Sequence, residues 1–74
     1  MNVAERDLWL VLAQSYAGRP TITLEEFLRD FMPMKRKTAL NRISAGTFPV
    51  KVLHERILVR DVAHWLHIER TRAA

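Results

Sequence analysis

The chain has 74 residues, a formal net charge of +4 and no cysteine. This length allows one small domain, which buries only about 60% of the surface that its unfolded chain exposes. The lack of cysteine excludes disulfides and thiolate metal sites, and a hydrophobic content of 49% argues against wholesale disorder. The longest apolar run, residues 8–13, is shorter than a signal peptide or a spanning helix requires. We therefore expect a cytoplasmic protein without membrane contact.

Charge is distributed unevenly along the chain. Residues 1–34 carry three arginines against five acidic residues, a net charge of −2. Residues 35–74 carry nine lysines and arginines against three acidic residues, a net charge of +6. This asymmetry predicts one basic face, and basic faces bind mostly nucleic acid or anionic membranes. A solvated basic surface without a partner stays open as an alternative.

The first predicted element is a helix over residues 3–17, within an N-terminal segment of residues 1–18. Gly18 ends this helix and Pro20 prevents its continuation. Apolar residues surround much of the helix, namely Leu8, Trp9, Val11, Leu12 and Tyr16. A helix of this kind is either buried on two sides or contributes to an oligomer. It is therefore the candidate contact of a homodimer or a cooperative oligomer.

A helix start is recognisable shortly after this first helix. Thr23 and Glu26 fit a capping box, in which each side chain binds a free backbone N–H of the helix start. Acidic residues in the first turn also suit the positive end of the helix dipole. We expect a helix over residues 24–31, which Pro33 separates from the next element.

A second short helix is expected over residues 34–45, with Gly46 as its C-terminal stop. At 100° per residue, its apolar and polar residues fall on opposite sides. The apolar side carries Ala39, Leu40 and Ile43, and the polar side carries Lys37, Thr38, Asn41 and Ala45, flanked by Lys35, Arg42 and Ser44. Arg36 falls on the apolar side, from which its long side chain can reach solvent. Two short helices joined by a tight break, over residues 23–46, are typical of a helix-turn-helix.

Residues 50–59 predict a short wing. Two β-rich runs, residues 51–53 and 56–59, are separated only by His54 and Glu55. A gap of two residues between such runs predicts a tight hairpin, although the usual Asn-Gly or Asp-Gly pair is missing.

The last predicted element is a helix over residues 60–72. The fold class is then mainly α with a short β-hairpin: a winged helix-turn-helix of the MerR/excisionase-like type, in a single small DNA-binding domain over residues 1–74. Its predicted core consists of Leu8, Leu12, Phe27, Leu28, Phe31, Leu40, Ile43, Phe48, Ile57, Val62, Trp65 and Leu66.

The polar side of the helix over residues 34–45 leads to a functional prediction. The major groove of B-DNA admits one helix, whose outward side chains meet the base edges. Arginine pairs with guanine and asparagine with adenine through two hydrogen bonds, which makes both residue types suited to base reading. The candidate DNA-binding residues are Lys37, Thr38, Asn41 and Arg42 for bases, Lys35 and Arg36 for phosphates, and Lys51, His54 and Arg56 for a neighbouring backbone or minor groove.

Each of these features also has a simpler explanation. A Lys-Arg-Lys triplet is often a solvated helix start, and Asn41 is compatible with any exposed helix surface. Arg56 and Arg60 could form exposed ion pairs with Glu55 and Asp61, which contribute only about 0–1 kcal/mol. The order of helix, break, basic helix, glycine stop, hairpin and helix favours DNA binding over these alternatives.

The sequence gives little basis for catalysis. His64 and His67 lie three residues apart, but no HExxH pattern or carboxylate pair completes a metal site, so surface histidines are favoured. Ser15 has no nucleophile elbow around it, and the chain has no glycine-rich phosphate loop. Trp9 and Trp65 stand at apolar helical positions, which is typical of core residues rather than of base-stacking platforms. We expect no enzyme activity, no cofactor and no metal.

Several short motifs occur in a distinctive order over most of the chain. They are Leu10-Val11-Leu12-Ala13-Gln14-Ser15-Tyr16, Gly18, Ile22-Thr23-Leu24, Asp30-Phe31, Thr38-Ala39, Gly46-Thr47-Phe48-Pro49-Val50 and Val59-Arg60-Asp61-Val62-Ala63. In this order the chain resembles the pyocin activator family, small phage- and bacteriocin-linked transcription regulators. The hairpin region, residues 52–57, is shorter here than in that family.

The resemblance implies sequence-specific binding to double-stranded DNA that activates phage-like or pyocin genes, on the nucleoid. RNA polymerase or a host regulator would be a further partner, and recognition of half-sites by a dimer is expected because one module buries little DNA surface. An excisionase-like DNA-bending factor is one rival function. A phage-encoded protein that inhibits a host regulator, with its basic helix on an acidic partner, is the other.

Overall fold

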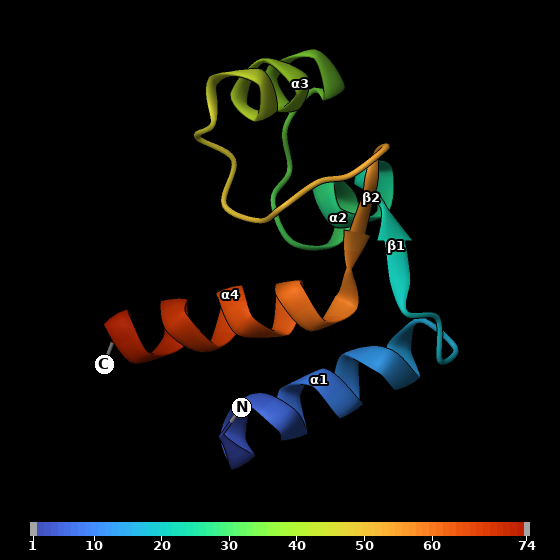
Figure 1. The fold of residues 1–74 in the computed structure, drawn as a ribbon, viewed down its shortest axis with the longest axis vertical. Helices are drawn as coiled ribbons and strands as arrows, with labels where there is room; N and C mark the ends of the chain where they lie inside the picture. The colour runs from blue at the N-terminus through green and yellow to red at the C-terminus, as the bar shows by residue number, and fades with distance from the viewer. Residues whose placement is uncertain (1, 74) are drawn as a thin grey trace.

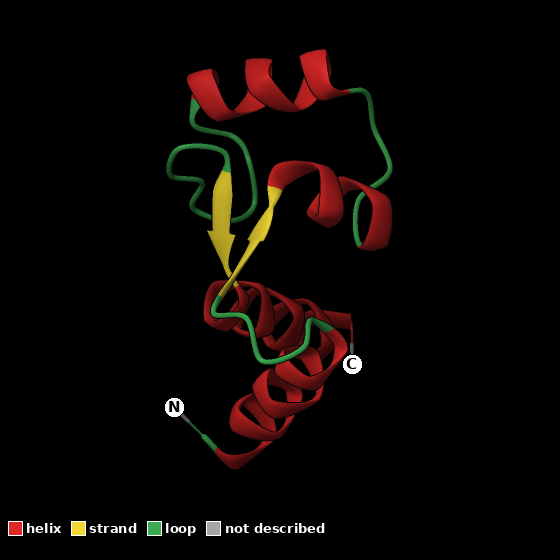
Figure 2. Ribbon diagram, turned by 90° about the vertical axis from the view of Figure 1, so that its right-hand side faces the viewer, coloured by secondary structure: helices red, strands yellow, loops and turns green. Residues whose placement is uncertain are grey.

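Four helices and a two-stranded antiparallel sheet make up residues 2–73, the part of the chain that the structure, a computed structural model, describes (Figure 1). The elements are α1 (Val3–Ser15), β1 (Thr21–Thr23), α2 (Leu24–Asp30), α3 (Arg36–Ala45), β2 (Arg56–Leu58) and α4 (Val59–Ala73). Helices α1 and α4 pack against each other at one end, and α3 lies at the other end beyond α2 and the sheet (Figures 1 and 2). This small, mainly helical arrangement is consistent with a winged-helix-like fold.

Side-chain caps set the starts of α1 and α2. The Glu5 N–H donates to Asn2 Oδ1 at 2.8 Å. Thr23 and Glu26 form the predicted capping box: the Glu26 N–H donates to Thr23 Oγ1 at 3.2 Å, and the Thr23 N–H donates to Glu26 Oε1 at 2.9 Å. Each bond satisfies an N–H group that has no partner inside its helix. The capping box is therefore confirmed.

Helix α1 ends earlier than the sequence indicates. It stops at Ser15, two residues before the predicted end. Ala17 and Gly18 have φ values of 56° and 77°, which is left-handed backbone that no α-helix contains. The Gly18 N–H donates back to the Ala13 oxygen at 2.7 Å, so this turn satisfies a carbonyl group at the end of α1.

Helix α3 begins later than predicted and ends at its predicted stop. It starts at Arg36 rather than at residue 34, because Lys35 is still extended and Met34 packs against the core. Gly46 has a φ of 74° and donates its N–H to the Ile43 oxygen at 3.1 Å. A glycine takes this left-handed conformation without the strain that a Cβ would cause.

The sheet differs from the predicted hairpin. β2 pairs with β1, with Thr21 opposite Leu58, Ile22 opposite Ile57 and Thr23 opposite Arg56. The expected strand over residues 51–53 does not form; only Leu53 makes a single bridge to Arg56 across the predicted tight turn. Sequence reasoning missed β1 because its three residues lie next to a strong helix cap and their partner is about 35 positions further along the chain.

Helix α4 follows β2 without a loop. It begins at Val59, one residue before its predicted start, and the Val59 N–H donates to the Pro20 oxygen at 3.0 Å. Ile57, Val59 and Val62 are all nearly inaccessible to solvent, so the strand and the start of α4 are anchored in the same core. None of the helices within residues 2–73 combines the length and the apolar character that a membrane crossing requires.

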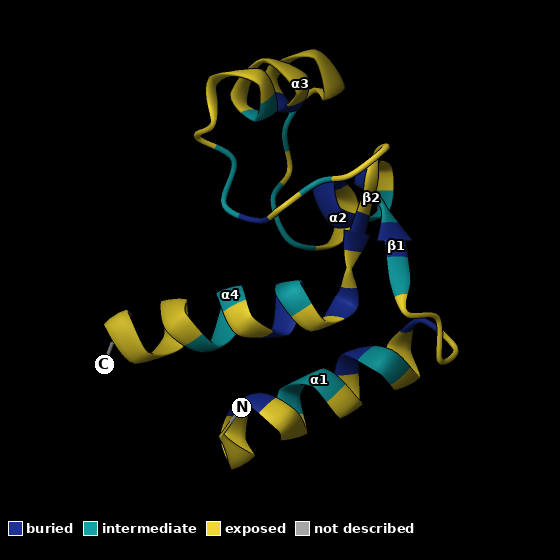
Figure 3. Cartoon of the chain, in the orientation of Figure 1, coloured by how far each residue is buried: buried dark blue, intermediate teal, exposed yellow. Residues whose placement is uncertain are grey.

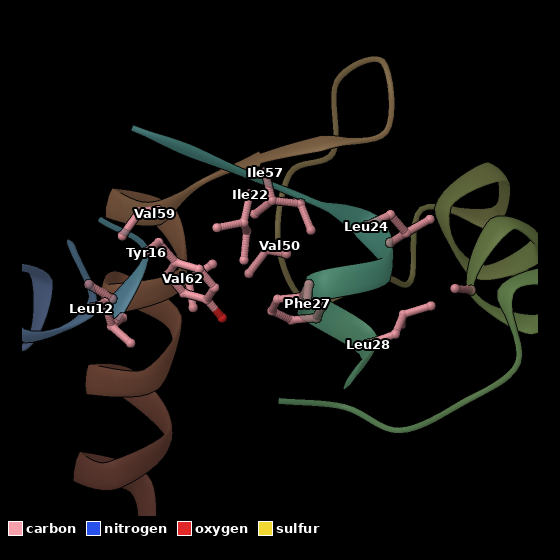
Figure 4. Packing of buried hydrophobic residues seen from close by; sticks show 12 residues of the cluster. Leu12, Tyr16, Ile22, Leu24, Phe27, Leu28, Val50, Ile57, Val59 and Val62 are labelled. Atoms are coloured by element: carbon pink, nitrogen blue, oxygen red, sulfur yellow. The ribbon is translucent and has the colours of Figure 1, made fainter. Parts of the chain in front are cut away.

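The hydrophobic core lies between the sheet, α2 and the facing sides of α1 and α4 (Figures 3 and 4). Aromatic rings meet around Phe27, whose centroid lies 5.4 Å from that of Trp65 and 5.6 Å from those of Phe31 and Phe48. Of the predicted core, the buried members are Leu12, Phe27, Leu28, Ile57 and Val62. The partly buried members are Leu8, Phe31, Ile43, Phe48, Trp65 and Leu66.

One predicted core residue is wrong and several were missed. Leu40 is 38% exposed, because Ala39 and Ile43 form the inner side of α3 and Leu40 points to its flank. Buried residues outside the predicted core are Tyr16, Ile22, Leu24, Ala39, Val50, Val59 and Ala63. Of these, Ile22 belongs to β1, whose pairing the sequence did not reveal; the others belong to the helices, their ends and the loop before β2.

Candidate nucleic-acid interface

Helix α3 presents a polar, exposed outer side. The four residues expected to read bases, Lys37, Thr38, Asn41 and Arg42, are all exposed. Ala39 is completely buried and holds the opposite side of α3 to the rest of the protein. Apart from Leu40, the burial pattern therefore agrees with the two sides that the helical spacing predicts, and Figure 3 shows α3 as mostly exposed.

The start of α3 lacks the caps that the starts of α1 and α2 have. Its N-cap residue, Lys35, makes no side-chain hydrogen bond, and its first turn contains no acidic residue. Positive charges lie instead at the positive end of the helix dipole, which is unfavourable by about 0.3–1 kcal/mol each for exposed groups. Free N–H groups next to lysine side chains form a site that suits an anion such as phosphate.

Arg36, a candidate phosphate contact, forms ion pairs with two acidic residues of the protein itself. Its guanidinium group binds the carboxylates of Glu25, at the start of α2, and of Glu55, in the turn before β2. The sequence did not predict these contacts, because Arg36 lies 11 and 19 residues from its two partners. Arg36 therefore links the start of α3 to α2 and to the turn before β2 through intramolecular ion pairs.

The three candidate residues of the wing, Lys51, His54 and Arg56, are exposed and line one groove. The volume of this groove is about 350 Å³. Its walls also include Leu53 and Leu58, which are 62% and 48% exposed. The wing therefore combines positive charge with an apolar surface. Lys51 lies in a loop and not on the strand that the sequence predicts.

The basic residues divide into paired and unpaired groups. Within residues 2–73, the arginines in ion pairs are Arg19, Arg29, Arg36 and Arg72. The ion pairs of Arg56 and Arg60 with Glu55 and Asp61, considered above as an alternative, are not found among these residues. Glu55 pairs with Arg36 instead, and the Arg60 guanidinium lies 6.0 Å from the ring centroid of Trp9. The candidate lysines and arginines that form no ion pair in this part of the chain are Lys35, Lys37, Arg42, Lys51 and Arg56.

The histidines of α4 join α4 to α1. His64 Nδ1 lies 2.6 Å from Oε1 of Glu5, a residue that is 7% exposed, and His67 Nε2 lies 3.0 Å from Asn2 Nδ2. In the described part of the chain, no three His, Asp or Glu side chains are grouped closely enough to hold a metal ion. His64 is exposed and His67 half-buried, so both are surface residues, as predicted, and each makes a polar contact with α1 or its N-cap.

A second polar cluster lies between the end of α1 and α2, beside an open groove of about 500 Å³. The Tyr16 hydroxyl donates to Asp30 Oδ2 at 2.6 Å, and Arg29 donates to both Asp30 oxygens at 2.8 and 3.1 Å. The Arg29 and Tyr16 hydrogen bonds lower the pKa of Asp30 to about 2. Burial, followed by the bond to Asp30, raises the pKa of Tyr16 above its ordinary value. The sequence did not indicate this cluster, because Tyr16 follows the end of α1 and its partners belong to α2.

Glu26, which lines the same groove, is also stabilised in its charged form. The Thr23 backbone hydrogen bond and then the Arg19 side chain lower the pKa of Glu26. The charges around this groove are therefore matched within the protein. This matching distinguishes the groove from α3 and the wing, where the basic residues other than Arg36 have no acidic partner among the described residues.

Comparison of the chain with protein-family models, with curated proteins and with solved structures gives no match. The geometry of α3 and the wing is therefore the basis for a functional proposal.

Proposed function

We propose that the protein is a sequence-specific DNA-binding transcriptional regulator that inserts α3 into the major groove. It acts by binding and not by catalysis. The observation that carries the proposal is the combination found on α3: an exposed polar outer side and an uncapped, basic N-terminus. Bound phosphate would supply the negative charge that this helix start lacks.

The dimensions of α3 suit this role. An α-helix with its side chains is about 10–12 Å in diameter, and the major groove is about 12 Å wide. The ten residues of α3 give a length of roughly 15 Å along the groove. Asn41 and Arg42 are the residues whose side chains can form two hydrogen bonds with one base, adenine and guanine respectively. Lys35 and the backbone of the first turn would bind a phosphate and set the position of the helix.

A dimer would place two copies of α3 on a pair of half-sites. The α1 residues Val3, Leu10 and Val11 are 65%, 52% and 59% exposed. At 100° per residue, Val3 and Leu10 lie on the side of the helix opposite Leu12, and Val11 lies about 100° from Leu12. Trp9 is half-buried instead, so it belongs to the core side of the contact and not to the free side. We propose the exposed apolar residues Val3, Leu10 and Val11, with the polar Asp7 between them, as the contact with a second copy.

A selection of preferred duplexes from a random pool tests the main proposal, with affinities measured at two salt concentrations. A recovered motif, above all a repeat with half-sites about one helical turn apart, would support a regulator. Recovery of no motif, with only weak and salt-sensitive binding to all duplexes, would contradict it.

Single substitutions separate base reading from charge. Asn41→Ala and Arg42→Ala are each expected to weaken binding to the selected duplex by about 1–3 kcal/mol while leaving random DNA unaffected. Fluorescence anisotropy with both duplexes measures the difference. Equal losses on the two duplexes would refute the assignment of this side of α3 to base contacts.

The exposed leucines of the wing favour one alternative, a protein-binding module. Leu53 and Leu58 lie in the same groove as Lys51 and Arg56, and phosphate contact makes no use of apolar side chains. An acidic segment with apolar residues, for example on RNA polymerase or a host regulator, would match this surface. In that case the duplex selection fails, and substitution of Leu58 but not of Asn41 abolishes the activity of the protein in cells.

A further inference from the structure

The turn before β2 does not follow the usual sequence preference of its type. His54 and Glu55 have φ values of 53° and 59°. Leu53 and Arg56 close the turn with mutual backbone hydrogen bonds of 2.9 and 3.0 Å. Positive φ at both central positions favours glycine or asparagine, because a Cβ strains the left-handed backbone. A glutamate at this position requires other contacts that hold it there.

Glu55 makes two such contacts. Its backbone oxygen accepts the N–H of Leu24, the first residue of α2, at 2.9 Å. Its carboxylate binds the guanidinium group of Arg36, which also binds Glu25. The turn, the start of α2 and the start of α3 therefore meet at one junction, beside the tip that Figure 1 shows next to α2. We call these residues, Glu25, Arg36 and Glu55, the three-element junction.

The junction has a direct effect on how α3 is held. Ala39 and Ile43 attach the middle of α3 to the rest of the protein, and they do so along a single side of the helix. A helix that is held only along one side can rotate or tilt around those contacts. Arg36 adds a fixed point at the helix start, and this point lies against the wing through Glu55.

The charge balance of the junction also matters for DNA binding. Two carboxylates surround the single positive charge of Arg36. The slope of DNA affinity against salt concentration reflects how many protein cations replace counterions at phosphates. Because Arg36 is already paired with two carboxylates, it should not contribute to this slope. Lys35, one residue earlier, forms no ion pair within residues 2–73 and is a suitable comparison.

We infer that Arg36 is a positioning residue, which fixes α3 relative to the wing by way of Glu55 and does not itself contact DNA. The inference rests on the proposed function, since it assumes that α3 is the helix that reads DNA. It also gives a reason for a glutamate at a left-handed position, since the Glu55 carboxylate binds Arg36 there.

The test compares three variants of the full chain, Arg36→Met, Glu55→Gly and the control Lys35→Ala, on the selected duplex and on a scrambled duplex. Arg36→Met and Glu55→Gly are expected to weaken binding to the selected duplex by roughly ten-fold, with unchanged affinity for scrambled DNA and an unchanged salt slope. Lys35→Ala is expected to weaken binding to both duplexes and to lower the salt slope by about one. Glu55→Gly should not lower the thermal midpoint, because glycine relieves the strained turn while an exposed ion pair is lost.

Two results would overturn the inference. In the first, Arg36→Met behaves like Lys35→Ala, which would make Arg36 a phosphate contact. In the second, Glu55→Gly leaves binding to the selected duplex unchanged. If the wild-type chain selects no duplex at all, the proposed function fails instead, and a double-mutant cycle of Arg36→Met and Glu55→Gly in urea tests the junction by itself. Additive effects in that cycle would reject the junction, and coupled effects would support it.

Discussion

Tyr16 is the single tyrosine of the chain, so its ionisation can be followed by the absorbance of the phenolate. Burial and the hydrogen bond to Asp30 both favour the neutral phenol and raise the pKa of Tyr16. We expect the folded protein to form phenolate only well above pH 10, and the chain unfolded in urea to titrate near the ordinary value of about 10. Since the folded-state pKa is raised, the stability that Tyr16 contributes is lost as the pH rises above 10.

The control for this titration is Asp30→Asn, which removes a negative charge next to the phenol. In folded Asp30→Asn, the pH midpoint of Tyr16 ionisation should lie below that of the folded wild type. Identical titration curves in buffer and in urea would show that Tyr16 is not held as the structure describes.

The same pair has the opposite dependence in acid. The folded-state pKa of Asp30, about 2, lies below its ordinary value of 3.8, so its contribution to stability is present above about pH 4 and is lost as the pH falls toward 2. Tyr16→Phe removes one of the bonds that lower this pKa, and we expect it to reduce the loss of stability between pH 5 and pH 2. At pH 7 the variant should be destabilised by about 1 kcal/mol, because the carboxylate is one-third exposed and solvent screens part of the bond.

Urea unfolding at several pH values measures this effect, with the free energy of unfolding compared between Tyr16→Phe and the wild type. Parallel pH profiles for the two proteins would contradict the role given to the hydroxyl.

At the scale of single elements, local signals determined what the sequence could predict. The capping box of Thr23 and the stop at Gly46 involve neighbours within a few residues, and both are found where they were expected. The pairing of β1 with β2 joins residues about 35 positions apart, and no pattern within three residues of β1 indicates its partner. The candidate site follows the same rule. Exposure on α3 is predictable from helical spacing except at Leu40, whereas the ion pairs of Arg36 are not predictable.

The uncapped start of α3 gives a prediction that joins stability to binding. Lys35 occupies the N-cap position with extended backbone, where a serine side chain would accept a backbone N–H of the first turn. We expect Lys35→Ser to stabilise the fold by about 0.5–1 kcal/mol. The same change removes a phosphate contact, so it should weaken binding to every duplex and lower the salt slope by about one.

Thermal unfolding and anisotropy titrations on one protein sample measure both effects of Lys35→Ser. A matched change at the other end of α3, Ser44→Ala, should alter neither quantity by much, since Ser44 is exposed and lies outside the candidate site. A variant that binds DNA as tightly as the wild type would show that the helix start does not face phosphate.

For the whole molecule, the structure refines the single basic face that the charge distribution predicts. Lys35, Lys37 and Arg42 belong to α3 and its start, but Arg70 and Arg72 lie in the last turn of α4. The C-terminal end of α4 lies far from α3 in both views (Figures 1 and 2). Cations in the last turn of a helix are favourable with the helix dipole, so the arginines of α4 have a structural explanation of their own. Net charge therefore overstates the basic surface available to DNA.

The proposed dimer is the prediction that depends on the molecule as a whole. Three exposed α1 side chains cover much less than the roughly 800 Å² per partner of a typical stable interface, so the free protein should dimerise weakly and DNA should strengthen the contact. Val11→Asp is expected to abolish the dimer in sedimentation and to weaken binding to a two-half-site duplex, while binding to one half-site stays unchanged. Leu53→Asp is the control, because Leu53 is 62% exposed against 59% for Val11 and lies on the wing. If Leu53→Asp removes the dimer and Val11→Asp does not, the wing is the contact between copies, and the exposed apolar residues of α1 do not form it.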